Sequence, residues 1–254
     1  MKLTSFEPPR FTESSLFRAE SDGQKYLVKS YLGARADFRC DLEARKLRHW
    51  AALGFSVPAV FDIEVADLKQ PYLVMGYIES VTLAQFLQQS NCHLDKKRTL
   101  LASVFECNAR RHQLALKTND SLLIHTDPNT DNILVTNQAF FHIDFEHPTK
   151  EKSLRLAVAQ EIAAFARRVA SNMEKQHLPE TVASLLSAYD HDHRLFSHVV
   201  ALTKGRPLQV IHRFKDRKRK RANPLLVTRY DIADAISKQL QPLGSPAGRE
   251  YGGR

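Results

Sequence analysis

The sequence predicts an α+β protein with two lobes, in which an antiparallel sheet carrying one helix precedes a mainly helical lobe. Strand patterns with a hairpin turn occupy the first part of the chain, and helical patterns occupy most of the chain from there to residue 203. A chain of 254 residues can form two modest lobes around one cleft. We place the N-terminal lobe at residues 1–78, the C-terminal lobe at 79–203, and a basic, partly disordered extension at 204–254.

The strand predicted at residues 25–31 follows a turn at Asp22-Gly23, a pair that strongly favours a two-residue hairpin. Along this strand Leu27 and Lys29 share one face. A lysine in such a strand, considered alone, is usually exposed to solvent. The next element changes that interpretation.

A helix is predicted from about Ala36 to Leu53, with Gly54 as its natural C-terminal residue. Glu43, Leu47 and Trp50 are spaced i, i+4 and i+7, so Glu43 lies on the apolar stripe that faces inward. A buried carboxylate needs a partner because an unpaired buried charge is costly.

Lys29 is the obvious partner for Glu43, and the pair would fix the ammonium beside bound phosphates. The alternative is a glutamate at the rim of the helix that pairs with Arg39 or Lys46 at helical spacing. The sequence alone leaves both arrangements open.

The C-terminal lobe is expected to be helical except for one hairpin at residues 133–143. His125 is interpreted as a structural histidine that bonds the loop backbone. The cluster Asp190-His191-Asp192-His193 is interpreted as an exposed capping segment, because no distant pair of ligands completes a metal site. Helices are predicted at residues 83–89, 94–117, 153–176, 179–189 and 192–203.

Three polar residues around that hairpin have the chemistry that phosphoryl transfer needs. Asp127 and Asn132 lie five residues apart, and Asp144 follows Asn132 by twelve. One carboxylate would orient the attacking hydroxyl, while an amide oxygen and a second carboxylate would hold a metal ion. We assign the first role to Asp127 and the metal to Asn132 and Asp144.

The hairpin supplies a geometric reason for this assignment. A loop at residues 137–139 would pair Thr136 with Phe140 and Asn132 with Asp144. Residues opposite each other in such a pair have Cβ atoms about 5 Å apart. The two oxygen ligands would then lie side by side, as magnesium requires.

Taken in order, these pieces resemble the protein-kinase-like superfamily over roughly residues 10 to 200. The matching pieces are Leu-Val-Lys, the helix glutamate, Tyr-Leu-Val-Met-Gly-Tyr-Ile-Glu, His-Thr-Asp-Pro-Asn-Thr-Asp-Asn-Ile-Leu-Val and Ile-Asp-Phe-Glu. The resemblance is closest to compact bacterial members: lipopolysaccharide core-sugar kinases, aminoglycoside and choline phosphotransferases, and the small atypical kinase of the tRNA-modification complex. It implies a two-lobed protein-kinase-like fold that binds ATP and Mg²⁺.

The resemblance also implies where the nucleotide lies. Met75 would sit behind the adenine, although ordinary core packing explains a methionine there equally well. Gly76, Tyr77 and Ile78 would offer backbone groups to the adenine edge. Lys29 and Glu43 would serve the phosphates.

The chain departs from the family pattern in the loop that would cover the phosphates. No G-x-G-x-x-G precedes Lys29, and that loop is expected near residues 11–15. Backbone amides and the hydroxyls of Thr12, Ser14 and Ser15 would bind phosphate there, less closely than glycines. Glu146 stands where protein kinases carry glycine, and an acidic residue at this point is frequent in small-molecule kinases. A nucleotide-binding pseudokinase scaffold is the alternative from another class.

The segment after Asp144 bears on the phosphate acceptor. Only about eight residues separate it from the next helical pattern, and no Ala-Pro-Glu motif follows. Since regulated protein kinases use a long segment there to dock peptides, a sugar or small-molecule hydroxyl is the favoured acceptor. An atypical serine/threonine protein kinase or a tRNA-modification-linked ATPase is the alternative.

Positive charge is concentrated between Lys204 and Arg221, where nine basic residues and one acidic residue give +8 of the chain's +9. Residues 215–221 are expected to bind an anionic membrane surface, with RNA as a less favoured ligand and a solvated charge run as the plain alternative. Residues 244–254 are expected to be disordered.

The expected compartment is the cytoplasm. No apolar run reaches about 18 residues, the start lacks a signal-peptide core, and the odd number of cysteines suits a reducing environment. The sequence thus predicts an ATP- and magnesium-dependent kinase, peripheral on the inner membrane face, that acts on a hydroxyl of a cell-envelope glycolipid such as lipopolysaccharide core.

Overall fold

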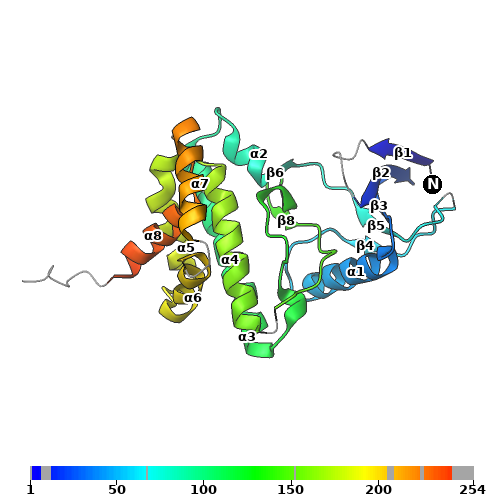
Figure 1. The fold of residues 1–254 in the computed structure, drawn as a ribbon. Coiled ribbons are helices and arrows are strands. Elements are labelled where there is room, and N and C mark those ends of the chain that lie inside the picture. Colours follow the sequence, from blue (N-terminus) through cyan, green and yellow to red (C-terminus); the bar gives the residue numbers. More distant parts are fainter. Residues whose placement is uncertain are drawn as a thin grey trace, which may run out of the picture.

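The computed structural model describes residues 2–6, 13–66, 68–151, 153–204, 209–223 and 226–241. A strand-rich lobe lies at one end and a helical lobe at the other, so the α+β, two-lobed expectation is confirmed (Figure 1). The expected disordered segment 244–254 and the candidate Thr12 lie outside the described residues.

The N-terminal lobe is an antiparallel sheet in the order β1-β2-β3-β5-β4. The predicted hairpin turn is present, with Asp22 and Gly23 both at positive φ, as a tight two-residue turn requires. Its strands are β1 (Lys2–Phe6), β2 (Ser14–Ser21), β3 (Gln24–Tyr31), β4 (Val60–Phe61) and β5 (Tyr72–Gly76).

Helix α1 (Ala36–Ala52) packs against β3, β4 and β5 of this sheet. It ends where predicted, because Gly54 adopts a φ of +76° that other residues rarely adopt. The stripe of Glu43, Leu47 and Trp50 is buried, as the spacing predicted.

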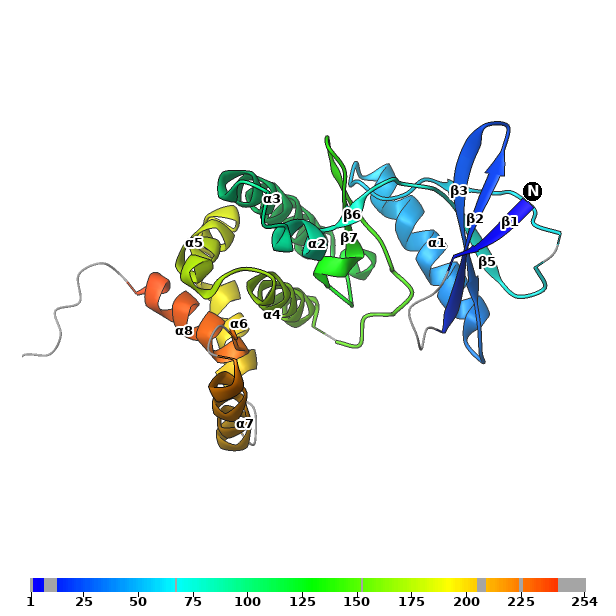
Figure 2. The ribbon, with the colours of Figure 1, turned by 90° about the horizontal axis from the view of Figure 1, so that it is seen from above.

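A second, small sheet lies between the strand-rich lobe and the helices (Figure 2). It consists of β6 (Val81–Thr82), β7 (Ile133–Val135) and β8 (Phe140–His142), with β7 in the middle. The predicted hairpin within the helical lobe is therefore present.

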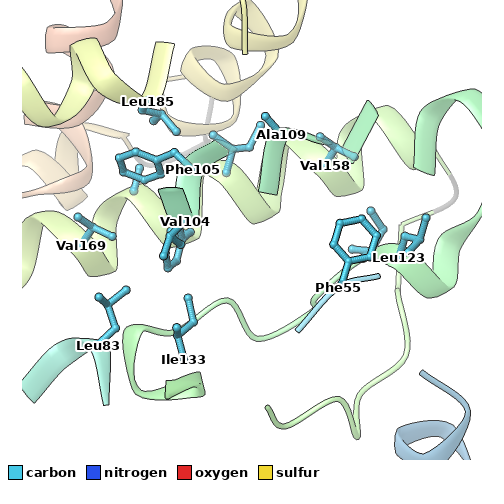
Figure 3. Close-up of a cluster of buried hydrophobic side chains, with 14 of the residues drawn as sticks. Phe55, Leu83, Val104, Phe105, Ala109, Leu123, Ile133, Val158, Val169 and Leu185 are labelled. Carbon is cyan, nitrogen blue, oxygen red and sulfur yellow. The ribbon is translucent and has the colours of Figure 1, made fainter. Parts of the chain in front are cut away.

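The helical lobe is built around α3 and α4, whose apolar faces contribute to one continuous core (Figure 3). The long helix predicted at 153–176 ends early, because the Asn172 side chain bonds the Arg168 carbonyl and a short 3-10 turn follows. The helices are α2 (Leu83–Gln88), α3 (Leu94–Thr118), α4 (Leu154–Ser171), α5 (Leu178–Ala188) and α6 (His193–Lys204).

The C-terminal region contains two further helices, α7 (Gln209–Ala222) and α8 (Arg229–Leu240). Helix α8 packs against α4, α5 and α6 and buries Ile232 and Ile236. The boundary suggested at residue 203 is therefore too early as a limit of packing, since α8 completes the helical core. Helix α7 projects from the lobe and presents mainly basic residues (Figure 2).

Candidate active site

Lys29 lies buried where the two lobes meet. Its Nζ is 2.8 Å from Glu43 Oε2 and 2.7 Å from Asp144 Oδ1, so β3, α1 and the segment after β8 meet at this atom. The predicted Lys29–Glu43 ion pair is confirmed. Glu43 is only 1% exposed, which excludes the alternative of a rim glutamate.

Glu43 has a complete set of partners. Besides Lys29, the Tyr31 hydroxyl donates to its Oε2 at 2.7 Å and the Phe145 backbone N–H donates to its Oε1 at 3.3 Å. Because these donors come from β3 and from the segment after β8, Glu43 ties both to α1. This carboxylate is therefore a positioning group for Lys29 and Asp144.

Glu146 and Arg39 also belong to the site, although neither was expected there from the sequence. Glu146 Oε2 lies 3.5 Å from Lys29 Nζ and 3.4 Å from Arg39 Nη1. Oxygen atoms of Glu43, Asp144 and Glu146 all lie within 4.8 Å of one another. The signal that could have indicated Glu146 was an acidic residue where protein kinases carry glycine. Nothing in the sequence indicates that Arg39 contacts Glu146.

The electrostatics of this cleft cluster, defined here as Lys29, Glu43, Asp144 and Glu146, follow from burial and charge. Burial alone would lower the pKa of Lys29, but the three carboxylates outweigh it and raise that pKa. Burial would raise the pKa of Asp144, but the Lys29 ammonium outweighs it and lowers that pKa. Burial and the neighbouring carboxylates raise the pKa of Glu146. The cluster thus carries more acid than base, which suits a cation.

Asp127 and Asn132 are joined in the loop before β7. The Asn132 side-chain amide donates to the Asp127 carbonyl at 3.0 Å and to its Oδ2 at 3.2 Å. This fixes the Asp127 carboxylate on the cleft. The Asn132 Oδ1 receives no hydrogen bond from the described residues, so it remains available as an oxygen ligand.

The predicted pairing of Asn132 with Asp144 across the hairpin is wrong by one residue. Val135 pairs with Phe140, and the Ile143 N–H donates to the Asn132 carbonyl at 3.0 Å. The reason is Thr136, whose hydroxyl bonds backbone groups of the turn and makes the loop four residues long, 136–139. Asp144 therefore follows the paired residues.

Asp144 leaves the strand with a φ of 69°, a left-handed conformation that a non-glycine residue rarely adopts. That conformation brings its carboxylate to Lys29. A magnesium site would use the carboxylates of Asp144 and Glu146 and the oxygen of Asn132. Hard oxygen donors of this kind fit magnesium.

The residues expected to contact the adenine differ in whether they are available to a ligand. Met75 is buried in the core beneath the sheet, and the Gly76 and Tyr77 amides already donate to Ala59 and Lys25 carbonyls. Of the three expected hinge amides, that of Ile78 makes no bond within the described residues.

Ser14 and Ser15 were expected in a loop. They lie instead in β2, where they pair with Tyr31 and Ser30. Extension of the β2–β3 hairpin toward Glu13 explains the difference. The Ser14 and Ser15 hydroxyls are therefore on strand side chains, of which Ser14 is buried.

His125 has the structural role expected of it. Its Nε2 lies 2.9 Å from the Ile143 carbonyl and its backbone N–H donates to Glu161 Oε2 at 2.9 Å. Burial lowers the pKa of this imidazole, so it is neutral and donates from Nε2.

Glu161 forms the other half of a second buried charge pair, in the helical lobe. Arg111 contacts both carboxylate oxygens of Glu161, the Leu123 carbonyl and Asn108 Oδ1. Burial would raise the pKa of Glu161, but Arg111 outweighs it and lowers that pKa. The pair anchors the loop that leads to Asp127.

Lys46 connects α1 to two loops of the helical lobe, one before Asp127 and one after Asp144. It is 1% exposed, and its Nζ donates to the Ile124 carbonyl at 2.8 Å and to the His147 carbonyl at 3.4 Å. Burial lowers the pKa of this lysine to about 8. By sequence, Lys46 was expected only as a rival partner of Glu43.

The segment Asp190–His193 is confirmed as a capping segment. Asp192 Oδ1 accepts a hydrogen bond from the Leu195 N–H at 2.9 Å, at the start of α6. Among the described residues, the one group of three acids or histidines close enough for a metal is that of Glu43, Asp144 and Glu146.

The fold is protein-kinase-like. In sequence, residues 11–120 match the phosphotransferase enzyme family. In structure, the chain is similar to a solved protein described as WaaP in complex with acyl carrier protein. That likeness has a TM-score of 0.53 at 16% identity and covers 92% of this chain and 89% of that one. No curated protein matches the chain. The expected resemblance to the protein-kinase-like superfamily is confirmed. The likeness to the solved structure supports the fold alone.

Proposed function

We propose that the protein is an ATP- and magnesium-dependent kinase that phosphorylates a hydroxyl group. The observation that carries this proposal is the position of Lys29 Nζ, held 2.8 Å from Glu43 and 2.7 Å from Asp144. A lysine fixed in this way presents its charge to nucleotide phosphates. The match of residues 11–120 to phosphotransferases supports the same reaction class.

The residues have separate roles in the proposed reaction. Asp127 orients the acceptor hydroxyl and takes its proton as the oxygen attacks the terminal phosphorus, and ADP leaves. Asn132 holds Asp127 in place. Asp144, with Asn132 and Glu146, would hold magnesium, which when bound neutralises phosphate charge.

For the acceptor we propose a sugar hydroxyl of a cell-envelope glycolipid at the cytoplasmic face of a membrane. The sequence resemblance to lipopolysaccharide core-sugar kinases and the short segment between β8 and α4 support this choice. In the described part of the chain, no helix is long and apolar enough to cross a bilayer.

Helix α7 is the proposed membrane-binding element. Its basic residues Arg217, Lys218, Arg219 and Arg221 are exposed, as is Phe214 at 69%. Each basic residue near an anionic leaflet contributes about 1 kcal/mol. Lys220 differs from the others, because its Nζ is 2.6 Å from Asp231 Oδ1.

Transfer of labelled phosphate from ATP to the lipid, protein, RNA and small-molecule fractions of a lysate tests the acceptor. We expect label in the lipid fraction, and label in protein or RNA alone would contradict the proposal.

A vesicle assay tests α7 separately. Replacing Lys218, Arg219 and Arg221 with Ser should abolish binding to anionic vesicles and leave ATP turnover unchanged. The control removes three exposed charges from α3, at Lys96, Arg98 and Lys117. Equal binding by both variants would contradict the role of α7, and a shift of RNA but not vesicles would favour the rival ligand.

A further inference from the structure

A cavity of about 660 Å³ opens beside Asp127, on the side of the helical lobe. Its walls come from the loop around Asp127, the segment 147–151, one face of α4, the end of α6 and the first residue of α8. Its volume suits a sugar-sized molecule. Because it adjoins Asp127, it is the natural place for the group that receives the phosphate.

The charges on these walls are unusual for a sugar site. The basic side chains Arg35, Lys150, Arg167 and Arg229 line the cavity, against the acids Asp127, Glu151 and Glu161. Glu161 is already neutralised by Arg111, so Asp127 and Glu151 are the carboxylates that remain to face Arg35, Lys150 and Arg229.

Three of the four basic groups lack an acidic partner. Within the described part of the chain, no carboxylate forms an ion pair with Arg35, Lys150 or Arg229. Glu151, the remaining acid, accepts a hydrogen bond from Gln160 at 2.6 Å. Uncompensated positive charge in a concave site attracts anions, since low-dielectric walls focus the field.

We propose that this cavity binds an acceptor that carries a phosphate monoester in addition to the hydroxyl that is phosphorylated. The inference rests on the proposed function, because it takes Asp127 as the group that orients the hydroxyl. Arg229 and Arg167 contact the phosphate of the acceptor. The planar guanidinium group matches phosphate oxygens in a two-bond geometry, which gives specificity as well as affinity.

The backbone of Arg229 has a fixed position in the fold. It is the first residue of α8, directly after Thr228, whose hydroxyl accepts from the Asp231 N–H while Asp231 accepts from the Thr228 N–H. This capping box fixes the helix start. The C-terminal region, which by sequence resembled an appendage, thus supplies a specificity residue of the proposed site.

Calorimetry with two probes tests the assignment. Mannose 6-phosphate and mannose are titrated into the full chain with saturating magnesium and a non-hydrolysable ATP analogue, so that the nucleotide site is filled. We expect the phosphorylated sugar to bind at least about tenfold more tightly, since charged hydrogen bonds are the strong ones. Arg229→Gln should remove that advantage. Equal affinity for the two probes, or an unchanged advantage in Arg229→Gln, would overturn the proposal.

Arg168→Gln is the matched control, because Arg168 neighbours Arg167 on α4 but is exposed and does not line the cavity. Should Arg229→Gln fail to fold, Lys150→Gln, which changes an exposed loop residue, provides the decisive comparison. It should reduce the advantage of the phosphorylated sugar, and no reduction would count against the proposal.

Two outcomes distinguish failure of this inference from failure of the proposed function. ATP turnover without phosphate-dependent binding would remove this inference and leave the proposed function intact. Phosphate-dependent binding without ATP turnover would remove the proposed function alone. Vesicles carrying phosphatidylinositol 4-phosphate, tested with Arg229→Gln, distinguish a lipid-borne phosphate from a soluble one.

Discussion

The protein contains two clusters of buried charge, which differ in charge balance and in exposure. In the cleft cluster, Lys29 faces three carboxylates, and the Asp144 side chain is 30% exposed. In the helical lobe, Arg111 and Glu161 are paired and the side chains are 0% and 4% exposed. One cluster has surplus acid and is open, and the other is balanced and closed.

This difference indicates that one cluster binds a ligand and that the other stabilises the fold. A buried pair whose charges balance has no surplus charge to offer a ligand, so Arg111 and Glu161 hold the loop before Asp127. A cluster with surplus acid gains from a cation, and one with an exposed edge can admit it. Similar residue types therefore have different roles, and the balance of charge and the exposure of each cluster decide which.

The largest effect is expected in the closed cluster. Arg111→Leu leaves Glu161 buried and unpaired, which should lower the free energy of unfolding by about 3–5 kcal/mol. Denaturant titration measures this, with the exposed Arg98→Leu as control. The double variant Arg111→Leu, Glu161→Leu should recover part of the loss. A single variant as stable as the control would show that the pair is not structural.

The next effect concerns Lys46 and pH. Its pKa in the folded protein is about 8, whereas the ordinary value is 10.5. Between these values the unfolded chain binds more protons, so this group's contribution to stability rises with pH. The wild type should gain about 3 kcal/mol relative to Lys46→Met from pH 8 to 10.5. Unfolding measured at both pH values checks this, and a constant difference between the two proteins would contradict it.

A smaller effect is expected in the cleft cluster, where it tests whether Asp144 holds magnesium. Asp144→Ala should weaken nucleotide binding in magnesium at least about tenfold, since losing even a neighbour of a metal ligand costs that much. Without magnesium, binding should stay equal or improve, because a carboxylate that repels phosphate is gone. Calorimetry with and without magnesium decides. Equal loss in both conditions would show that Asp144 holds no metal, and Asp131→Ala is the control.

The sequence predicted those parts of the site that depend on local periodicity. The strand face of Lys29 and the helix stripe of Glu43 gave their ion pair as one of two arrangements, and the structure contains this one. The same reasoning placed Asp127 and Asn132 in one loop. These features follow from spacings within single elements, which the chain carries explicitly.

Other parts depend on contacts that periodicity does not encode. One side-chain hydrogen-bond pattern, that of Thr136, shifted the hairpin by one residue. Arg111 and Glu161 are fifty residues apart, and their pairing appears only when α3 and α4 pack. Helix α8 follows the basic residues of α7 and looked like part of an appendage, yet its apolar face completes the core.

The central claim is that Asp127 acts on the acceptor within a magnesium-dependent phosphotransferase. The direct test measures ATP turnover and nucleotide affinity for the wild type, Asp127→Asn and the control Asp131→Asn, with and without magnesium. We expect the wild type and the control to turn over ATP only with magnesium. Asp127→Asn should lose about 10²–10⁴ in rate and keep its nucleotide affinity. Near-normal turnover by Asp127→Asn, or no turnover by the wild type, would contradict the account.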